Sequence, residues 1–330
     1  MSTNNEAYLC LSAMLRAREP KLLTNERAER MLDAPSFDEA AKLLTDCGYE
    51  DMSSMNAGEI EAALAEHRAE VFCELEELSP NPEIVYLFKL KYDYHNLKTL
   101  IKAEAMGTDP TRLLSASGRI APEELTSVYN DGRWAELTDT MGDAAQEAKA
   151  VLARTANPQL ADVVLDQAYF NELKKLAQST ESGFLMGYVE LLTDCANLKS
   201  AVRTLRMGKN ADFLQSVLLS GGSVDEARIA AAGDIDGVAA LFGSTALEKA
   251  AALGVEAVSG GSVTAFELAC DNAVTAYLSD ARLMSYGCEP VIAYMAAVEG
   301  EITAVRMILT GRLSGVSPEI IRERLRDLYA

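Results

Sequence analysis

Three hexapeptides, spaced about one hundred residues apart, decide the fold of this chain. They read Asp-Tyr-His-Asn-Leu-Lys at 93–98, Asp-Cys-Ala-Asn-Leu-Lys at 194–199 and Glu-Ile-Thr-Ala-Val-Arg at 301–306. The second begins 101 positions after the first and the third begins 107 positions after the second. Each has an acid, then Asn or Ala three residues later, then an aliphatic residue and a base. Because tetratricopeptide and HEAT repeats are only about 34 to 47 residues long, this spacing indicates a larger repeated module.

Apolar residues surround each hexapeptide at alternating spacings of three and four, which is typical of a helix with one buried seam. These positions are Leu87, Leu90, Tyr94, Leu97 and Ile101; then Tyr188, Leu191, Cys195, Leu198 and Val202; and then Met295, Val298, Ile302, Val305 and Leu309. Gly107, Gly208 and Gly311 follow the three seams and predict left-handed helix C-caps. Sustained alternation of apolar and polar residues is missing. We therefore predict an all-α fold.

Further correspondences between the second and third units support an internal repeat. The stretch from Gly118 to Leu125 parallels the stretch from Gly222 to Ile229. Asp166 likewise parallels Asp271. The first unit matches less well, with 37–49 as its short-helix segment. We predict three related helical-bundle modules with a pseudo-threefold internal repeat, spanning 1–107, 108–208 and 209–330.

The acid and the base of each hexapeptide flank the apolar seam on opposite sides. Residues five apart on one helix do not face each other, so each is expected to reach an adjacent helix. They can fix the packing of helices within a module, or form part of an interface between subunits. One acid per module does not predict a catalytic carboxylate pair. The residues of this signature are Asp93, Asn96, Lys98, Asp194, Asn197, Lys199, Glu301 and Arg306.

The composition excludes several classes of protein and of binding partner. The 330 residues include 50 acids and 30 Lys or Arg, a net charge of −20, and 49% of them are hydrophobic. This apolar content excludes a disordered chain, and the charge disfavours nucleic acid and anionic lipid as partners. No apolar run reaches the length of a membrane span, and Met1–Pro20 does not resemble a signal peptide. We therefore expect a cytoplasmic protein without a direct membrane span.

No cofactor or metal site is predicted. The six cysteines form no C-x-x-C pair, and we interpret most of them as small core residues in a reducing compartment. Phosphate-binding and hydrolase motifs do not occur. The two histidines, His67 and His95, have no assignable catalytic partners. Ser223, with Glu226 three residues later, predicts a capping box at the start of a helix.

The segment 317–329 predicts an amphipathic helix, with Ser317 as its N-cap and Pro318 in the first turn. It carries the densest basic cluster of an acidic chain, formed by Arg322, Arg324 and Arg326. These arginines form either a solvated helix face or a docking contact.

Taken together, these stretches resemble the C subunit of the V-type/A-type rotary ATPases, whose eukaryotic counterpart is the d subunit. The resemblance rests on 92–98, 194–199, the stretch from Gly287 to Arg306, and the ending Ile320–Arg326. It covers essentially the whole chain. Ala304 is a departure, because the family pattern often has Asn there.

The resemblance implies a funnel-shaped, all-helical subunit without a nucleotide site or catalytic residues of its own. Such a protein sits on the cytoplasmic face of the proteolipid ring, one copy per complex, and receives the foot of the central stalk. It couples the stalk to the ring in ATP-linked proton or sodium transport. The acidic chain would be drawn to Lys- and Arg-rich loops of the ring. The alternatives are a cytoplasmic helical scaffold or adaptor, and an all-α enzyme with a pocket between modules.

Overall fold

The computed structural model describes residues 5–330. Residues 1–4, which begin the predicted first module and the segment compared with a signal peptide, lie outside the described residues. Across residues 5–330 the regular structure is helical and no strand occurs, so the all-α prediction is confirmed.

The α-helices follow one another through connections of varied length, some of which contain short 3₁₀ turns. In chain order they are α1 (Leu9–Arg18), α2 (Asn25–Asp33), α3 (Phe37–Lys42), α4 (Ala57–Leu78), α5 (Glu83–Met106), α6 (Pro122–Asp131), α7 (Asp139–Thr155), α8 (Pro158–Ser179), α9 (Gly183–Arg206), α10 (Ala211–Val217), α11 (Glu226–Ala231), α12 (Ile235–Leu241), α13 (Glu248–Val258), α14 (Val263–Ser279), α15 (Cys288–Leu313) and α16 (Pro318–Arg322). The hexapeptides lie on α5, α9 and α15, the longest helices of the described chain.

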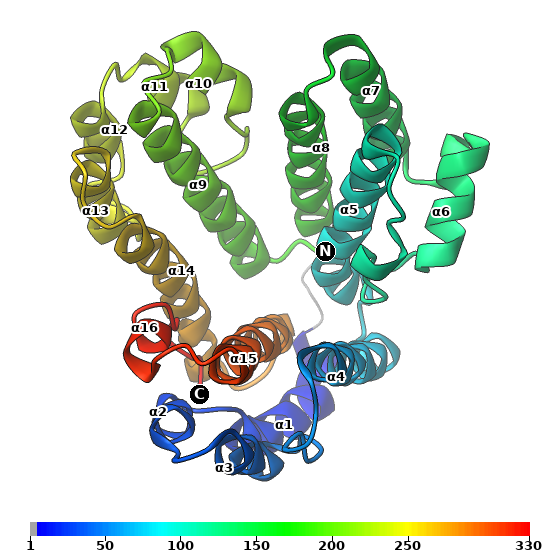
Figure 1. The fold of residues 1–330 in the computed structure, drawn as a ribbon, viewed down its shortest axis with the longest axis vertical. Helices are drawn as coiled ribbons and strands as arrows, with labels where there is room; N and C mark the ends of the chain where they lie inside the picture. The colour runs from blue at the N-terminus through cyan, green and yellow to red at the C-terminus, as the bar shows by residue number, and fades with distance from the viewer. Residues whose placement is uncertain (1–4) are drawn as a thin grey trace.

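Packing gathers these helices into three groups, which surround the middle of the view in Figure 1. Helices α5 to α8 form one group, and α9 to α14 form another. The third group is built from both ends of the chain, because α15 packs against α1, α2, α3 and α4, and α16 packs against α15 and α2. The last long helix therefore needs the first helices of the chain to cover it.

The three predicted apolar seams are confirmed, since all fifteen of their side chains are buried. Helix α15 is buried on more than this seam, because it also contacts α5 and α14 of the other two groups. A helix enclosed in this way needs apolar residues around much of its circumference.

The predicted division at 107/108 and 208/209 falls just after α5 and α9. By packing, however, α5 goes mainly with α8, α6 and α7, and α9 goes mainly with α13, α14, α10 and α12. The division into three modules stays a prediction, and the packing favours boundaries that precede each of these long helices.

Two of the three predicted glycine C-caps are confirmed and one is wrong. Gly107 and Gly208 take left-handed conformations with φ of 63° and 64°. Gly311 instead lies inside α15, and Gly315, with φ of 71°, takes the left-handed position beyond the helix. A Cβ at Gly311 would lie 2.8 Å from Ile321 Cδ1, so this glycine allows the close approach of α16.

The predicted capping box at Ser223 is also wrong. Helix α11 begins at Glu226 and is capped by Asp225, whose carboxylate accepts the N–H groups of Ala227 and Arg228. Ser223 does not cap this helix, because its N–H and hydroxyl both donate to Asp194 of α9.

The predicted C-terminal helix is much shorter than 317–329. Helix α16 ends at Arg322, and Ser317 makes no side-chain capping bond. Beyond it, the N–H of Asp327 donates to Asn272 Oδ1 and that of Leu328 to Asn25 Oδ1. These tertiary bonds take the amides that would otherwise continue the helix.

The six thiols are unpaired; Cys47, Cys195, Cys270 and Cys288 are buried, whereas Cys10 and Cys73 are exposed. The prediction that most cysteines belong to the core is therefore confirmed. Within residues 5–330, no helix combines the length and the apolar character that crossing a bilayer demands.

Candidate functional site

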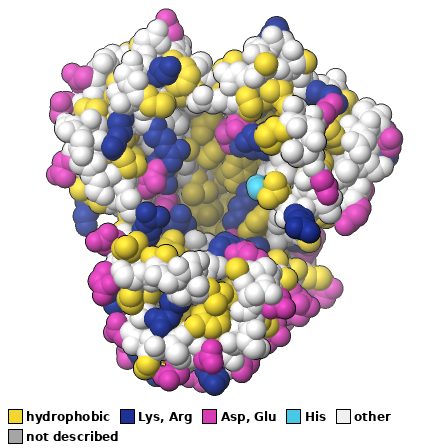
Figure 2. Space-filling model, viewed as in Figure 1, with side chains coloured by type: hydrophobic (Ala, Val, Ile, Leu, Met, Phe, Trp, Pro, Cys, Tyr) yellow, Lys and Arg dark blue, Asp and Glu magenta, His cyan; other side chains and the backbone are white. Residues whose placement is uncertain are grey.

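Figure 2 shows a face that is hollowed between the three groups of helices, with hydrophobic side chains deep in the hollow. A cavity of about 280 Å³ lies where the groups meet. Apolar side chains from all three groups line it. They are Leu87 and Phe88 of α5, Tyr169 and Leu173 of α8, Tyr188 and Leu192 of α9, Val274 and Leu278 of α14, and Ala296 of α15. A concave apolar surface of this kind is typical of a binding site.

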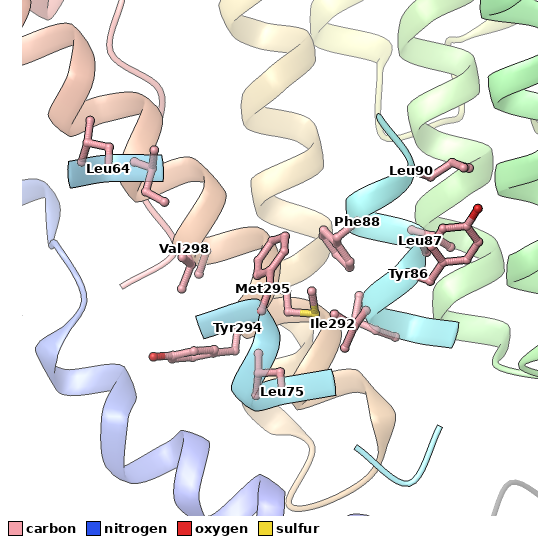
Figure 3. Close-up of a cluster of buried hydrophobic side chains, with 14 of the residues drawn as sticks. Leu64, Leu75, Tyr86, Leu87, Phe88, Leu90, Ile292, Tyr294, Met295 and Val298 are labelled. Carbon is pink, nitrogen blue, oxygen red and sulfur yellow. The ribbon is translucent and has the colours of Figure 1, made fainter. Parts of the chain in front are cut away.

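A shared apolar core supports one side of the hollow. Figure 3 shows Leu75 of α4, Phe88 of α5 and Met295 of α15 among side chains that gather between these three helices. The ring of Phe88 also stacks on that of Tyr188 of α9, with centroids 5.9 Å apart. Close packing of this kind resists compression, so α4, α5 and α15 are held firmly against one another.

A charge cluster that includes the buried Arg68 joins α4, α5 and α15 beside this core. The guanidinium Nε of Arg68, a residue only 4% exposed, lies 3.2 Å from Glu299 Oε1. Lys91 Nζ lies 2.8 Å from the other carboxylate oxygen, and the hydroxyl of Tyr92 donates to both oxygens at 2.8 and 2.9 Å. Arg68 Nη1 donates to Ser117 Oγ at 3.1 Å. Loss of Glu299 would leave the buried guanidinium of Arg68 without a compensating charge, so this carboxylate helps to fix the relative position of the three helices.

Arg68 was not predicted from the sequence, because this residue belongs to no repeated position. Leu64 and Phe72 lie one helical turn to either side of it and are fully buried. Its position could still have indicated a role, because a base on the apolar face of a helix requires an acidic partner.

The acid of the first hexapeptide anchors the loop that follows its own helix. Asp93 is fully buried and accepts the N–H groups of Ile120 at 3.1 Å and Arg119 at 3.3 Å. Gly118 makes this approach possible, because a Cβ there would lie 2.1 Å from Asp93 Oδ1.

The second hexapeptide repeats this arrangement. Asp194 accepts the N–H groups of Ser223 and Val224, both at 3.2 Å. A Cβ on Gly222 would again lie 2.1 Å from the carboxylate Oδ1. The parallel between the stretches at Gly118 and Gly222, predicted from sequence, thus corresponds to equivalent contacts.

The asparagines of the first two hexapeptides bind the same loops. Asn96 accepts from the N–H of Ser115 at 2.7 Å and donates to its carbonyl at 2.8 Å. Asn197 makes the same pair of bonds with Leu219, both at 2.8 Å. Ala304 has no amide with which to do this, so the third hexapeptide lacks the second anchor.

The third acid binds a segment from the opposite end of the chain. Glu301, which is 2% exposed, accepts the N–H of Leu23 and, at 2.6 Å, the hydroxyl of Tyr49. This N-terminal segment contacts Glu301 as the loops after α5 and α10 contact Asp93 and Asp194.

Burial raises the pKa of all three acids. The pKa of Asp93 is raised to about 6, mainly by removal of the carboxylate from water, although the N–H groups of Ile120 and Arg119 oppose the shift. The pKa of Glu301 is also raised to about 6 for the same reason. Burial raises the pKa of Asp194, against the effect of its bonds from Ser223. In each case the removal of the carboxylate from water outweighs the hydrogen bonds that favour its charged form.

The bases of the hexapeptides reach neighbouring helices, as predicted. Lys98 Nζ lies 2.5 Å from Asp166 of α8, and Lys199 Nζ lies 2.7 Å from Asp271 of α14. Arg306 Nε lies 2.6 Å from Glu61 of α4. The corresponding prediction for the acids is wrong, because backbone N–H groups satisfy a buried carboxylate and the adjacent loops supply them.

The C-terminal arginines occupy three different environments. Arg322 pairs with Glu29 at 2.8 Å and Asp33 at 3.0 Å, and Arg326 pairs with Asp271 at 2.8 Å. Arg324 is exposed. Their role in docking stays a prediction.

The two histidines lie apart from one another in different environments. His95 is exposed on α5, with Nε2 3.0 Å from the carbonyl oxygen of Leu113. His67 packs its ring 4.4 Å from that of Tyr49, and burial lowers its pKa. Within residues 5–330, no group of three or more His, Cys, Asp or Glu is arranged to hold a metal ion.

Comparison with known protein families identifies the family of this chain. The model of the family described as "ATP synthase (C/AC39) subunit" matches residues 11–324. The chain belongs to this family. The resemblance to V-type/A-type C subunits seen in the sequence is thereby confirmed.

Named relatives agree with this membership of the C/AC39 family. The C subunit of a V-type sodium ATPase from Enterococcus hirae is 26% identical over 332 residues, covering 98% of this chain and 99% of that protein. The C subunit of an A-type ATP synthase from Methanocaldococcus jannaschii is also 26% identical, over 97% of this chain and 86% of that protein. The C subunit of a V-type ATP synthase from Thermus thermophilus is 26% identical over 68% of this chain and 70% of that protein.

Proposed function

We propose that this C/AC39-family chain is a non-catalytic central-stalk subunit of a V/A-type rotary ATPase, and that it couples the rotating stalk to the membrane proteolipid ring. The observation that carries the proposal is the full-length match, in which the family model spans residues 11–324. The names of relatives from bacteria and an archaeon support the same complex. ATP-linked proton or sodium transport would then depend on catalysis by other subunits.

The architecture suits a coupling role. A hollow between three packed groups of helices provides a socket for a shaft. Torque then passes through the apolar joint of α4, α5 and α15 and the charge cluster around Glu299, both of which resist relative movement of these helices.

We further propose that the three groups are related units arranged as a funnel. The equivalent contacts of Asp93 and Asp194, each beside a glycine, support a common origin for the α5 and α9 groups. The third unit then combines α1 to α4 with α15 and α16.

The proposed location is the cytoplasmic face of the membrane, held there through the complex. Acidic side chains are spread over the outer margins of the face in Figure 2. Opposite charge on cytoplasmic loops of the ring would favour this contact. Binding to a detergent-solubilised ring should therefore weaken as salt rises, and binding independent of salt would exclude charge as the attractive force.

The deciding experiment is capture of the tagged full-length chain from native membranes, with mass spectrometry of the retained proteins. Proteolipid and stalk subunits should be retained together, and membranes from cells lacking the chain should lose ATP-driven ion transport until it is added back. Retention of none of these subunits would favour a scaffold elsewhere, and substrate turnover by the isolated chain would favour an enzyme.

A further inference from the structure

Two ion pairs that join α5 to α8 recur between α9 and α14. Each base and each acid of the first set has a counterpart in the second, with the bases 101 positions apart and the acids 105. The pairs are Lys98 with Asp166 at 2.5 Å and Lys102 with Asp162 at 2.7 Å, and then Lys199 with Asp271 at 2.7 Å and Arg203 with Glu267 at 2.5 Å. The acidic positions of α8 therefore correspond to those of α14.

Asp166 and Asp271 differ in one contact. On α14, Oδ1 of Asp271 faces its lysine, and Oδ2 lies 2.8 Å from Nε of Arg326 in the C-terminal strap (residues 323–330). On α8, Oδ1 of Asp166 likewise faces its lysine, but the other oxygen has no cationic partner among residues 5–330. The side chain of Asp166 is accordingly 47% exposed, and that of Asp271 is 22% exposed. A second base can pair with Asp166 as Arg326 pairs with Asp271.

The residue that follows each acid repeats this difference. On α14, Oδ1 of Asn272 accepts the N–H of Asp327 of the strap at 3.0 Å. Gln167 takes the same place on α8, and within the described chain only its amide nitrogen is used, as a donor to the carbonyl of Ser216 at 3.3 Å. Helix α14 thus binds a base and a backbone N–H of one segment side by side. Helix α8 carries the same two kinds of acceptor, to which the described chain supplies no such segment.

A groove of about 460 Å³ lies beside Asp166, between α8 and α9, which diverge from the turn that joins them in Figure 1. It shares no lining residue with the central cavity. Two acids and two bases line it, each in one of the ion pairs above, so the groove has no surplus of charge. Much of the remaining lining is apolar and consists of Val163, Phe170, Met207, Phe213, Val217 and Leu219. An occupant would therefore meet an apolar surface and one carboxylate oxygen without a cation.

We propose that this groove binds an extended segment of another protein, in which a basic residue is flanked by aliphatic ones. The strap shows the chemistry that suits such a face, because Arg326 lies between Leu325 and Leu328, which both pack against the core. In the groove, the aliphatic residues cover the apolar lining and the base pairs with Asp166. This inference goes beyond the coupling role and does not depend on it.

The probe is a synthetic, fluorescently labelled peptide with the sequence of residues 322–330, titrated with the purified full-length chain. Asp166→Asn should weaken its binding about fivefold, the loss expected for one partly exposed ion pair. Asp162→Asn is the matched control, because it removes an acid one turn earlier, whose counterpart Glu267 pairs with Arg203 and not with the strap. It should bind the peptide as wild type does. Melting curves of both variants are compared first.

A peptide carrying Arg326→Gln completes the test. It should bind wild type about fivefold more weakly, yet bind Asp166→Asn as the original peptide does, because the two changes remove the same contact. Equal loss of binding with Asp162→Asn and Asp166→Asn would overturn the inference, since any acid would then serve. Binding that depends on Asp271 instead would mean that the peptide replaces the strap, and this outcome or the absence of binding would overturn it too.

A photoreactive phenylalanine in place of Ser200, which lines the groove, identifies the natural occupant in native membranes. The cross-linked peptide should contain Lys or Arg beside aliphatic residues, and its yield should fall when Asp166→Asn is combined with the photoreactive residue. An acidic peptide, the strap of a second copy, or a yield independent of Asp166 would overturn the inference. The coupling role is tested separately, by retention of proteolipid and stalk subunits.

Discussion

Helices α9 and α15 use the same acidic position in different ways. Asp194 on α9 binds the loop that follows α10, the next helix along the chain, and Asn197 holds the same loop at a second point. Glu301 on α15 instead binds Leu23 and Tyr49, more than 250 residues away in sequence, and Ala304 provides no second anchor. The group around α15 is completed by the beginning of the chain, so its stability depends on contacts of very long sequence separation.

The largest effect is expected for the acid that joins the two ends of the chain. Glu301→Ala leaves the Leu23 N–H and the Tyr49 hydroxyl buried without an acceptor, and should lower the free energy of unfolding by about 4 kcal/mol. Denaturant titration measures this loss. Hydrogen exchange at Leu23 should accelerate, while exchange at Val224 keeps its wild-type rate. Equal acceleration at both sites would contradict the separate anchoring of these segments.

The next largest loss of stability is expected when a glycine that lies against a buried acid is replaced, and not when a glycine without such a neighbour is replaced. Gly118→Ala and Gly222→Ala place a methyl group 2.1 Å from the Asp93 or Asp194 carboxylate, and each should cost about 3 kcal/mol. Gly183→Ala, with no neighbour at the added methyl, is the matched control and should leave the unfolding free energy nearly unchanged. If all three variants unfold alike, the close approach to the acids is unimportant.

An asparagine side chain at this position of the hexapeptide should stabilise the fold in α9 but not in α15. Asn197→Ala orphans both the N–H and the carbonyl of Leu219 and is expected to cost about 2 kcal/mol in thermal or chemical unfolding. The reciprocal change, Ala304→Asn, buries an amide at a position that is 4% exposed and should also destabilise. Stabilisation by Ala304→Asn would mean that a partner for this amide is present after all.

A smaller effect is expected from pH. The pKa of Asp93 in the folded chain, about 6, lies above its ordinary value of 3.8, so the folded state binds a proton more readily than the unfolded state. This group therefore adds stability as pH falls below 6 and removes it as pH rises through 6. Between about pH 7 and pH 5, wild type should gain about 1 kcal/mol relative to Asp93→Asn. Parallel melting curves for the two proteins across this range would contradict the shift.

The smallest effect concerns the C-terminal arginines. Arg322→Ala breaks two pairs at the surface and should lower the melting temperature only slightly, because exposed ion pairs are weak. Arg324→Ala, at an exposed position, should not change it. Loss of membrane capture by Arg324→Ala at unchanged stability would support the docking prediction, and unchanged capture would reject it.

The sequence by itself determined the helices and their repetition. Spacings of three and four fix which face of α5, α9 and α15 is buried, because a helix has 3.6 residues per turn whatever surrounds it. The shared glycine and acid positions likewise correspond to equivalent contacts in two groups, since a close approach needs the same small residue each time.

Only the tertiary structure decided which elements complete each group. Ser223 leaves its predicted cap for Asp194, the helix beyond Arg322 gives way to bonds with Asn25 and Asn272, and Arg68 finds Glu299 on a distant helix. These partners are set by long-range packing. Local periodicity cannot predict these partners, because residues that packing brings together from distant parts of the chain share no fixed spacing in the sequence.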